Sequence, residues 1–119
     1  MSRYKKTPFK PWESTKFDGI EKRYIRLSDT QLMSTAMKKL KPLSFKIYIY
    51  MRIESAGRKD FKFPHGVYNK KLKICSKQGF QNALKDLQQN GFIEVKEHNK
   101  NLRIANVYSF SDKWKGVCF

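Results

Sequence analysis

Residues 75–95, CSKQGFQNALKDLQQNGFIEV, carry the clearest structural signal in the chain. Ser76 is a good helix N-cap, because its hydroxyl can accept a hydrogen bond from a backbone N–H of the first turn. Gly91 is suited to the left-handed conformation that ends many helices. Between them, apolar residues recur at the i, i+3, i+4 and i+7 spacing of one buried stripe: Phe80, Ala83, Leu84 and Leu87. We therefore predict a helix over residues 76–89.

A β-hairpin is predicted directly after this helix. Residues 92–97 form its first strand and residues 102 to about 110 form the return strand, so the hairpin covers about 92–110. The four polar residues at 98–101 make the turn between them. The apolar residues that share one face of the return strand are Leu102, Ile104, Tyr108 and Phe110.

Near the N-terminus, the sequence predicts a first helix over about residues 29–40. Ser28 followed by Gln31 has the form of a capping box, in which the two side chains satisfy backbone N–H groups of the first turn. Pro42 is expected to end this helix. The apolar residues that share its face are Leu32, Met33, Ala36, Met37 and Leu40.

A second helix is predicted over about residues 44–56, with Ser44 as its N-cap and Gly57 as its C-terminal cap. Its apolar residues also alternate as they would in a strand, but the length of the segment and both caps favour the helix. The expected apolar face contains one polar residue and is formed by Phe45, Tyr48, Ile49, Arg52, Ile53 and Ala56. Residues 60–63 are predicted as a short strand and residues 65–71 as a short helix.

From residue 44 onward the predicted order is helix, short strand, short helix, longer helix, strand, polar turn, strand. This is the order of the winged helix-turn-helix, an α+β fold, here with an extra N-terminal helix in front of it. Residues 1–23 are basic and contain two prolines, which predicts an arm without regular structure. At 119 residues the chain fits one domain, so we expect a winged helix domain over residues 24–119, preceded by a basic N-terminal arm.

The charge of the chain points to a polyanionic partner. It contains 26 Lys and Arg against 10 Asp and Glu, a net charge of +16, which is far more than solubility requires. Nucleic acid is the commonest such partner, and an anionic membrane surface is the next. No apolar run approaches the length of about 18 residues that spans a membrane, and the N-terminus lacks the apolar run of a secretory signal. We therefore expect no membrane insertion and a cytoplasmic location.

Two stretches resemble a known group of DNA-binding proteins. Residues 75–95 follow the form Ser-x-x-x-Phe-x-x-Ala-hydrophobic-x-x-Leu-x-x-x-Gly-Phe-Ile, which is similar to the recognition helix and first wing strand of winged helix proteins. Residues 24–51, YIRLSDTQLMSTAMKKLKPLSFKIYIYM, resemble the opening of small replication and DNA-processing proteins of Gram-positive phages, plasmids and conjugative elements. The resemblance spans Tyr24 to Trp114.

This resemblance implies sequence-specific binding to double-stranded DNA, as a monomer or a homodimer on the DNA. The processes that it implies are replication, conjugative transfer or transcriptional control of a mobile element. It leaves other replication or transfer proteins open as further partners.

The buried stripe of the helix over residues 76–89 leaves an outer side on which we expect DNA contacts. Gln and Asn can each bind adenine through two hydrogen bonds, Lys can bind guanine, and the helix N-terminus can hold a phosphate. The same residue types also form ordinary solvated faces, which is the alternative interpretation. The candidate residues are Ser76, Lys77, Gln78, Gln81, Asn82 and Lys85.

Three further sets of basic and polar residues are candidate DNA contacts. Phosphate contacts are expected on and just after the short helix, from Tyr68, Asn69, Lys70, Lys71 and Lys73. Wing contacts are expected from His98, Asn99, Lys100, Asn101 and Arg103. A basic arm that could enter the minor groove would use Arg3, Lys5, Lys6 and Lys10. For each set, a solvated turn or tail is the alternative.

Signals for catalysis or metal binding are weak. His65 and His98 lie far apart without a paired acid, and together with Cys75 and Cys118 they lack every usual zinc spacing. The six glycines are scattered and form no phosphate-binding loop. We therefore expect no enzyme activity, no cofactor and no metal. Two alternatives to DNA binding stay open: a winged helix protein-interaction module that inhibits a nucleic-acid-processing machine, and RNA binding.

Overall fold

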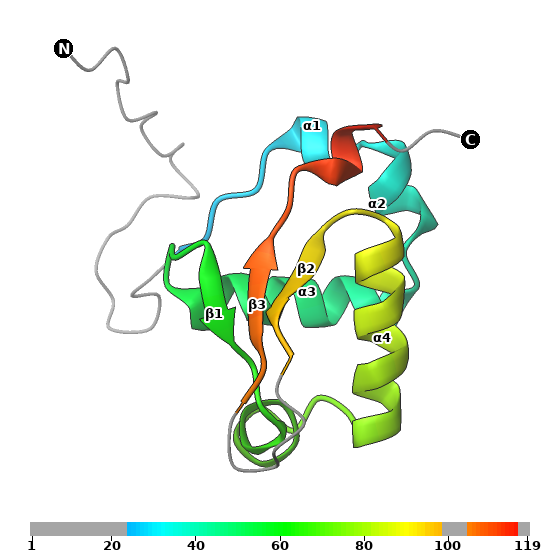
Figure 1. Ribbon diagram of the computed structural model, residues 1–119. Coiled ribbons are helices and arrows are strands. Elements are labelled where there is room, and N and C mark those ends of the chain that lie inside the picture. The colour runs from blue at the N-terminus through cyan, green and yellow to red at the C-terminus, as the bar shows by residue number, and fades with distance from the viewer. Residues whose placement is uncertain (1–23, 99–104, 117–119) are drawn as a thin grey trace, which may run out of the picture.

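Helix α3 (Pro42–Ser55) lies behind a three-stranded antiparallel sheet and packs against helix α4 (Lys77–Gln89), as Figure 1 shows. The computed structural model describes residues 24–98 and 105–116. In chain order, the other elements are α1 (Asp29–Leu32), α2 (Thr35–Lys39), β1 (Asp60–Lys62), η2 (Gly66–Lys71), β2 (Ile93–Glu97), β3 (Val107–Phe110) and η3 (Lys113–Gly116). The described chain is thus a small α+β unit, as the sequence predicts.

The predicted first helix is divided into two short ones. Ser28 caps α1 as predicted, with its Oγ accepting from the backbone N–H of Gln31 at 3.1 Å. Ser34 acts as a second N-cap: its Oγ accepts from the N–H of Met37 at 3.2 Å and donates to the carbonyl of Gln31 at 2.6 Å. A serine that bonds the backbone in this way competes with the helical hydrogen bonds. The prediction of one continuous helix over residues 29–40 is therefore wrong at Ser34.

The second predicted helix is confirmed as α3, but it begins earlier. Lys41 is its N-cap and Pro42 occupies the first position, where a helix does not use the N–H that proline lacks. Ser44, which we predicted as the cap, is instead 1% exposed inside the helix. The helix ends where predicted, since Ala56 and Gly57 both adopt positive φ angles, 51° and 84°.

The face of α3 that packs into the core differs from the predicted one. Of the predicted apolar face, only Tyr48 is buried, and Phe45 is 37% exposed. A helix that is apolar on most sides has no periodicity to indicate which side is buried. The buried residues of α3 are Ser44, Ile47, Tyr48, Met51 and Ser55.

Helix α4 and the two elements before it match their predictions. The Oγ of Ser76 accepts from the N–H of Gly79 at 3.1 Å, and Gly91 ends the helix with a φ of 80°. The predicted short strand is β1, and the predicted short helix is η2, a single wide turn closed by the N–H of Leu72 on the carbonyl of Val67. The predicted stripe of α4 faces the core, with Leu84 only partly buried and three residues fully so: Phe80, Ala83 and Leu87.

The sheet has the strand order β1-β3-β2, so the return strand of the hairpin is the central one. The hairpin is confirmed, with Val95 of β2 opposite Tyr108 of β3. Within the described chain β3 is shorter than predicted, because it begins at Val107 and leaves residues 105–106 outside the strand. Residues 99–104, which hold most of the predicted turn, lie outside the described residues.

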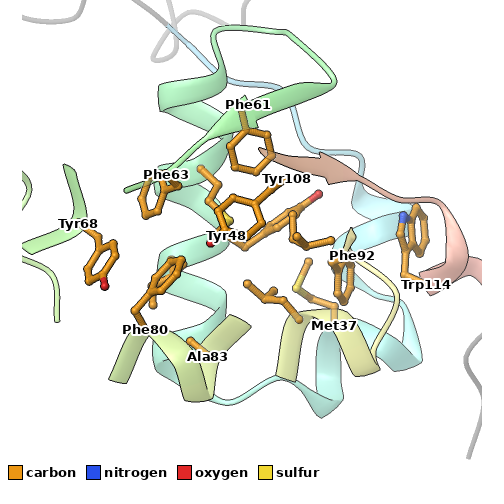
Figure 2. Close-up of a cluster of buried hydrophobic side chains, with 14 of the residues drawn as sticks. Met37, Tyr48, Phe61, Phe63, Tyr68, Phe80, Ala83, Phe92, Tyr108 and Trp114 are labelled. Carbon is orange, nitrogen blue, oxygen red and sulfur yellow. The ribbon is translucent and has the colours of Figure 1, made fainter. Parts of the chain in front are cut away.

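Aromatic side chains from several elements meet in the core, as Figure 2 shows. The ring of Tyr48 lies 5.3 Å from that of Phe92 and 5.8 Å from that of Phe110, measured between centroids. Trp114 of η3 lies parallel to Phe92, with 6.1 Å between the ring centroids. We did not predict η3, because the four residues after the possible caps Ser111 and Asp112 show no apolar period.

Gly91 should be one of the positions at which the fold tolerates no side chain. A Cβ atom there would lie 2.5 Å from backbone atoms of Lys113 and Trp114. Its positive φ also costs an L-residue about 1–2 kcal/mol, and overpacking costs about 1–3 kcal/mol. We expect Gly91→Ala to lower the free energy of unfolding by about 2–5 kcal/mol, measured by urea denaturation.

Gly66→Ala is the matched control. No atom lies within 4 Å of the Cβ that this substitution adds, and the φ of Gly66 is outside the left-handed region. Its free energy of unfolding should stay within about 1 kcal/mol of the wild type. Equal stability of the two alanine variants would contradict the packing of η3 against Gly91.

Candidate nucleic-acid interface

The outer face of α4 is an exposed row of amide and ammonium side chains. Its members follow one another at the i, i+3, i+4 and i+7 positions, so they lie on one side of the helix. The buried stripe occupies the other side. The outer face consists of Gln78, Gln81, Asn82 and Lys85, all of them exposed.

A hydrogen bond within the outer face orients one of its amides. Nε2 of Gln78 donates to Oδ1 of Asn82 at 3.1 Å. A carbonyl oxygen has two acceptor sites, so Asn82 keeps one acceptor site and both N–H donors. An amide uses one acceptor and one donor when it binds the edge of adenine. Gln78 can therefore hold Asn82 in place without occupying the atoms that such a contact needs.

The only acidic residue of α4, Asp86, is tied to neighbouring parts of the protein. Its Oδ2 accepts from the backbone N–H of Lys41 at 3.0 Å, and its Oδ1 accepts from the side-chain amide of Asn90 at 3.1 Å. The first bond joins the C-terminal half of α4 to the start of α3, and the second ties the carboxylate to the C-cap of α4 itself. The outer face of α4 carries no carboxylate, which is the charge pattern that suits a polyanion.

The N-terminal end of α4 is open to solvent. Ser76 and Lys77 are both exposed, and no acidic residue lies in the first turn. The first N–H groups of a helix have no partner within the helix, and the helix dipole is positive at this end. All six residues predicted on this helix therefore lie at the surface, on the outer face or at its N-terminal end.

The predicted phosphate contacts around η2 divide into different environments. Tyr68 is 4% exposed, and its ring stacks on that of Phe80 with 4.1 Å between centroids, so the structure places it in the core. Asn69 donates through Nδ2 to the carbonyl of Cys75 at 3.0 Å and holds the turn before α4. Nζ of Lys71 lies 3.0 Å from a carboxylate oxygen of Glu54. The remaining two residues of the set, Lys70 and Lys73, are exposed.

The wing and arm candidates lie largely beyond the described residues. His98 is exposed directly after β2. The other wing candidates, Asn99, Lys100, Asn101 and Arg103, and the arm candidates, Arg3, Lys5, Lys6 and Lys10, lie outside the described residues.

Two titratable groups behind α4 are held in their neutral forms. Burial raises the pKa of the Cys75 thiol, so it is protonated at neutral pH and is a poor nucleophile. Burial likewise raises the pKa of the Tyr68 hydroxyl. Over residues 24–98 and 105–116, no three His, Cys, Asp or Glu side chains come together as metal ligands.

Sequence reasoning missed a second basic surface. Arg26, Arg52, Arg58 and Lys59 line a cavity of about 870 Å³ beside the end of α3. One signal was visible: Arg52 interrupts the predicted apolar face of that helix. The residues that line the cavity come from three separate stretches of the chain, 24–26, 52–59 and residue 110, so no local pattern joins them.

The described residues thus present an acid-free helix face and a separate arginine-lined cavity. Among these residues, no helix is both long enough and apolar enough to cross a membrane. Comparison with known protein families, with curated proteins and with solved structures finds no match for this chain.

Proposed function

We propose that this protein is a winged helix-turn-helix protein that binds double-stranded DNA, with the outer face of α4 in the major groove. The element order α3, β1, η2, α4, β2, β3 supports this fold, because it is the order of the winged helix-turn-helix. The three-stranded antiparallel sheet is compatible with it. The proposed role is that of a non-enzymatic mobile-element protein in replication, conjugative transfer or transcriptional control, and it rests on the sequence resemblance.

The observation that carries the proposal is the chemistry of the outer face of α4. The major groove admits an α-helix, and its base edges are recognised by amide and cationic side chains. Residues in the N-terminal half of a recognition helix make most of these contacts. The exposed amides of Gln78, Gln81 and Asn82 lie in that half, and the only carboxylate of the helix is held elsewhere.

Phosphate contacts would then come from the residues that flank α4. Lys70 and Lys73 are exposed on the chain segment that leads into the helix, and Lys77 is exposed in its first turn. Such contacts position a protein on the duplex but carry no sequence information. The net charge of +16 supplies the long-range attraction.

Selection of duplexes from a random pool, followed by footprinting, tests the proposed function. A single enriched motif, protected in the footprint, is the expected result. A palindromic motif would indicate a homodimer, because the symmetry of the site mirrors that of the protein. Enrichment of no motif would overturn sequence-specific binding and favour the protein-interaction alternative.

Binding to duplex DNA should depend strongly on salt. If about six to ten phosphates are neutralised, affinity should fall by about 10³–10⁵ between 50 and 200 mM salt, because bound counterions are released from the DNA. Fluorescence anisotropy with a labelled duplex measures this. A matched single strand and a duplex RNA serve as controls, and tighter binding to either one, or no effect of salt, would contradict the proposal.

Asn82→Ala and Gln81→Ala should each reduce affinity for the selected site. A bidentate base contact is worth about 1–3 kcal/mol of binding free energy at the selected site. On random DNA the same substitution should reduce the binding free energy much less. The affinity for both duplexes is measured by anisotropy. If both variants fold and bind the selected site as the wild type does, then α4 does not recognise bases.

Two further variants separate base recognition from other effects. Gln89→Ala removes an exposed amide at the C-terminal end of the same helix and should leave affinity unchanged. Lys70→Ala should weaken binding to selected and random DNA alike and reduce the salt slope by about 1. Melting temperatures of all the variants should match the wild type, since each altered side chain is exposed.

A further inference from the structure

A cavity of about 870 Å³ opens at the end of α3, between that helix, the chain before α1 and the end of β3. Figure 1 shows the end of α3 and the start of β1 on the opposite side of the domain from α4. The cavity therefore lies apart from the proposed DNA-binding face. Its volume falls in the range of about 300–1,000 Å³ that is usual for small-molecule sites.

Two arginines of this cavity are held in place by backbone carbonyls. Nη2 of Arg52 donates to the carbonyl of Arg26 at 2.5 Å, and its guanidinium lies 5.3 Å from the ring centroid of Phe110. Nε of Arg58 donates to the carbonyl of Ser55 at 3.1 Å. A guanidinium has five N–H donors, so each arginine retains several for a ligand. Because the side chains are already ordered, a ligand would spend little free energy in fixing them.

The arginines of this cavity are not neutralised by carboxylates, whereas Lys59 lies close enough to Asp60 and Glu94 to lower the pKa of both. None of its lining residues is acidic, and none of the arginines has an ion pair within the described chain. The two acidic residues nearest in sequence are held by lysines elsewhere: Glu54 by Lys71 and Asp60 by Lys96. Three arginines without an acidic partner, with Lys59 beside them, favour a ligand with more than one negative charge.

The C-terminus of α3 works against an anion here, because the helix dipole is negative at this end. The structure reduces this effect by occupying the last carbonyls. The carbonyl of Ser55 accepts from both the backbone N–H and Nε of Arg58, and the carbonyl of Ile53 accepts from the N–H of Ala56. The carbonyl of Arg52 accepts from Oγ of Ser55.

The rest of the lining is apolar and partly aromatic. Ile25 and Ile53 contribute aliphatic surface, and Phe110 contributes a ring. This ring is fixed from behind, since it stacks on Phe61 with 4.6 Å between centroids and meets Tyr48 edge to face. Phe61 and the Arg52 guanidinium both lie against this ring, so a flat ligand body would pack on the aliphatic side chains and on the Arg52 guanidinium beside the ring.

We propose that this cavity binds a phosphorylated small molecule with a flat aromatic group, such as a nucleoside monophosphate. A phosphate presents three oxygens to the guanidinium donors, whereas a carboxylate presents only two. Both halves of the ligand are needed: the phosphate for the arginines and the flat body for the apolar lining. The site goes beyond the proposed DNA binding and does not depend on it.

Titration of the full chain with adenosine monophosphate, followed by calorimetry and amide NMR, tests this site. We expect saturable binding, with shifts centred on residues 52–59 and 110. Adenosine and inorganic phosphate should each bind at least about tenfold more weakly, because each lacks one half of the contacts. Equal binding of inorganic phosphate, or shifts centred on α4, would overturn the proposal.

Arg58→Gln and Lys85→Gln form a matched pair, because each removes one positive charge from an exposed side chain. Arg58→Gln should weaken binding of the nucleotide by about tenfold to a hundredfold, while Arg58→Lys should restore part of it. Lys85→Gln should leave nucleotide binding unchanged and weaken binding to the selected duplex, on which Arg58→Gln has no effect. The two proposals can thus fail separately.

Equal losses of nucleotide binding in the two glutamine variants would indicate a general charge effect and overturn the site. A peptide with phenylalanine between glutamates is a second control. If this peptide binds the cavity more tightly than the nucleotide does, the cavity is a protein-docking surface and the proposal is overturned. The melting temperature of Lys85→Gln should match the wild type, and Arg58→Gln should still fold cooperatively, because the Ser55 carbonyl keeps its bond from the backbone N–H of residue 58.

Discussion

The side chain of Tyr48 is the contact on which the arrangement of the domain depends. It is 2% exposed near the middle of α3, and its ring meets Phe92 at the start of β2 and Phe110 at the end of β3. Its hydroxyl accepts from Nε2 of Gln31 at 2.9 Å, which joins α1 to the same point. One residue therefore fixes the first helix, the long helix and two strands relative to each other. The apolar ring and the polar hydroxyl are both satisfied, as a buried tyrosine requires.

The elements that could be predicted from sequence are those in which several local signals agree. Helix α4 has a serine cap, one apolar stripe and a terminal glycine, and the structure has all three. At Ser34 the local signals are insufficient, because whether a serine hydroxyl bonds the backbone depends on the neighbouring turn. The buried face of α3 was not predictable for a different reason: apolar residues surround that helix, and only tertiary packing selects one side.

The candidate site likewise divides into residues with a local sequence signal and residues placed by tertiary packing. The outer face of α4 was predictable because the buried stripe determines the opposite side. The place of Tyr68 was not, because its stacking partner Phe80 lies on another element. The cavity beside α3 is lined by the chain before α1, the end of α3 and β3. These segments are far apart in the sequence, so only the folded structure reveals the cavity. DNA contact by the outer face stays a prediction until the duplex experiments are done.

The bond between Asp86 and the backbone N–H of Lys41 has a consequence for how this protein can change over evolutionary time. The partner of the carboxylate is a main-chain group, so any residue except proline at position 41 preserves the anchor. The buried stripe and this anchor together hold α4 without help from its exposed side chains. The outer face can therefore vary freely in chemistry while the helix keeps its place. A scaffold of this kind can acquire a new binding preference by surface substitutions alone, at little cost in folding stability.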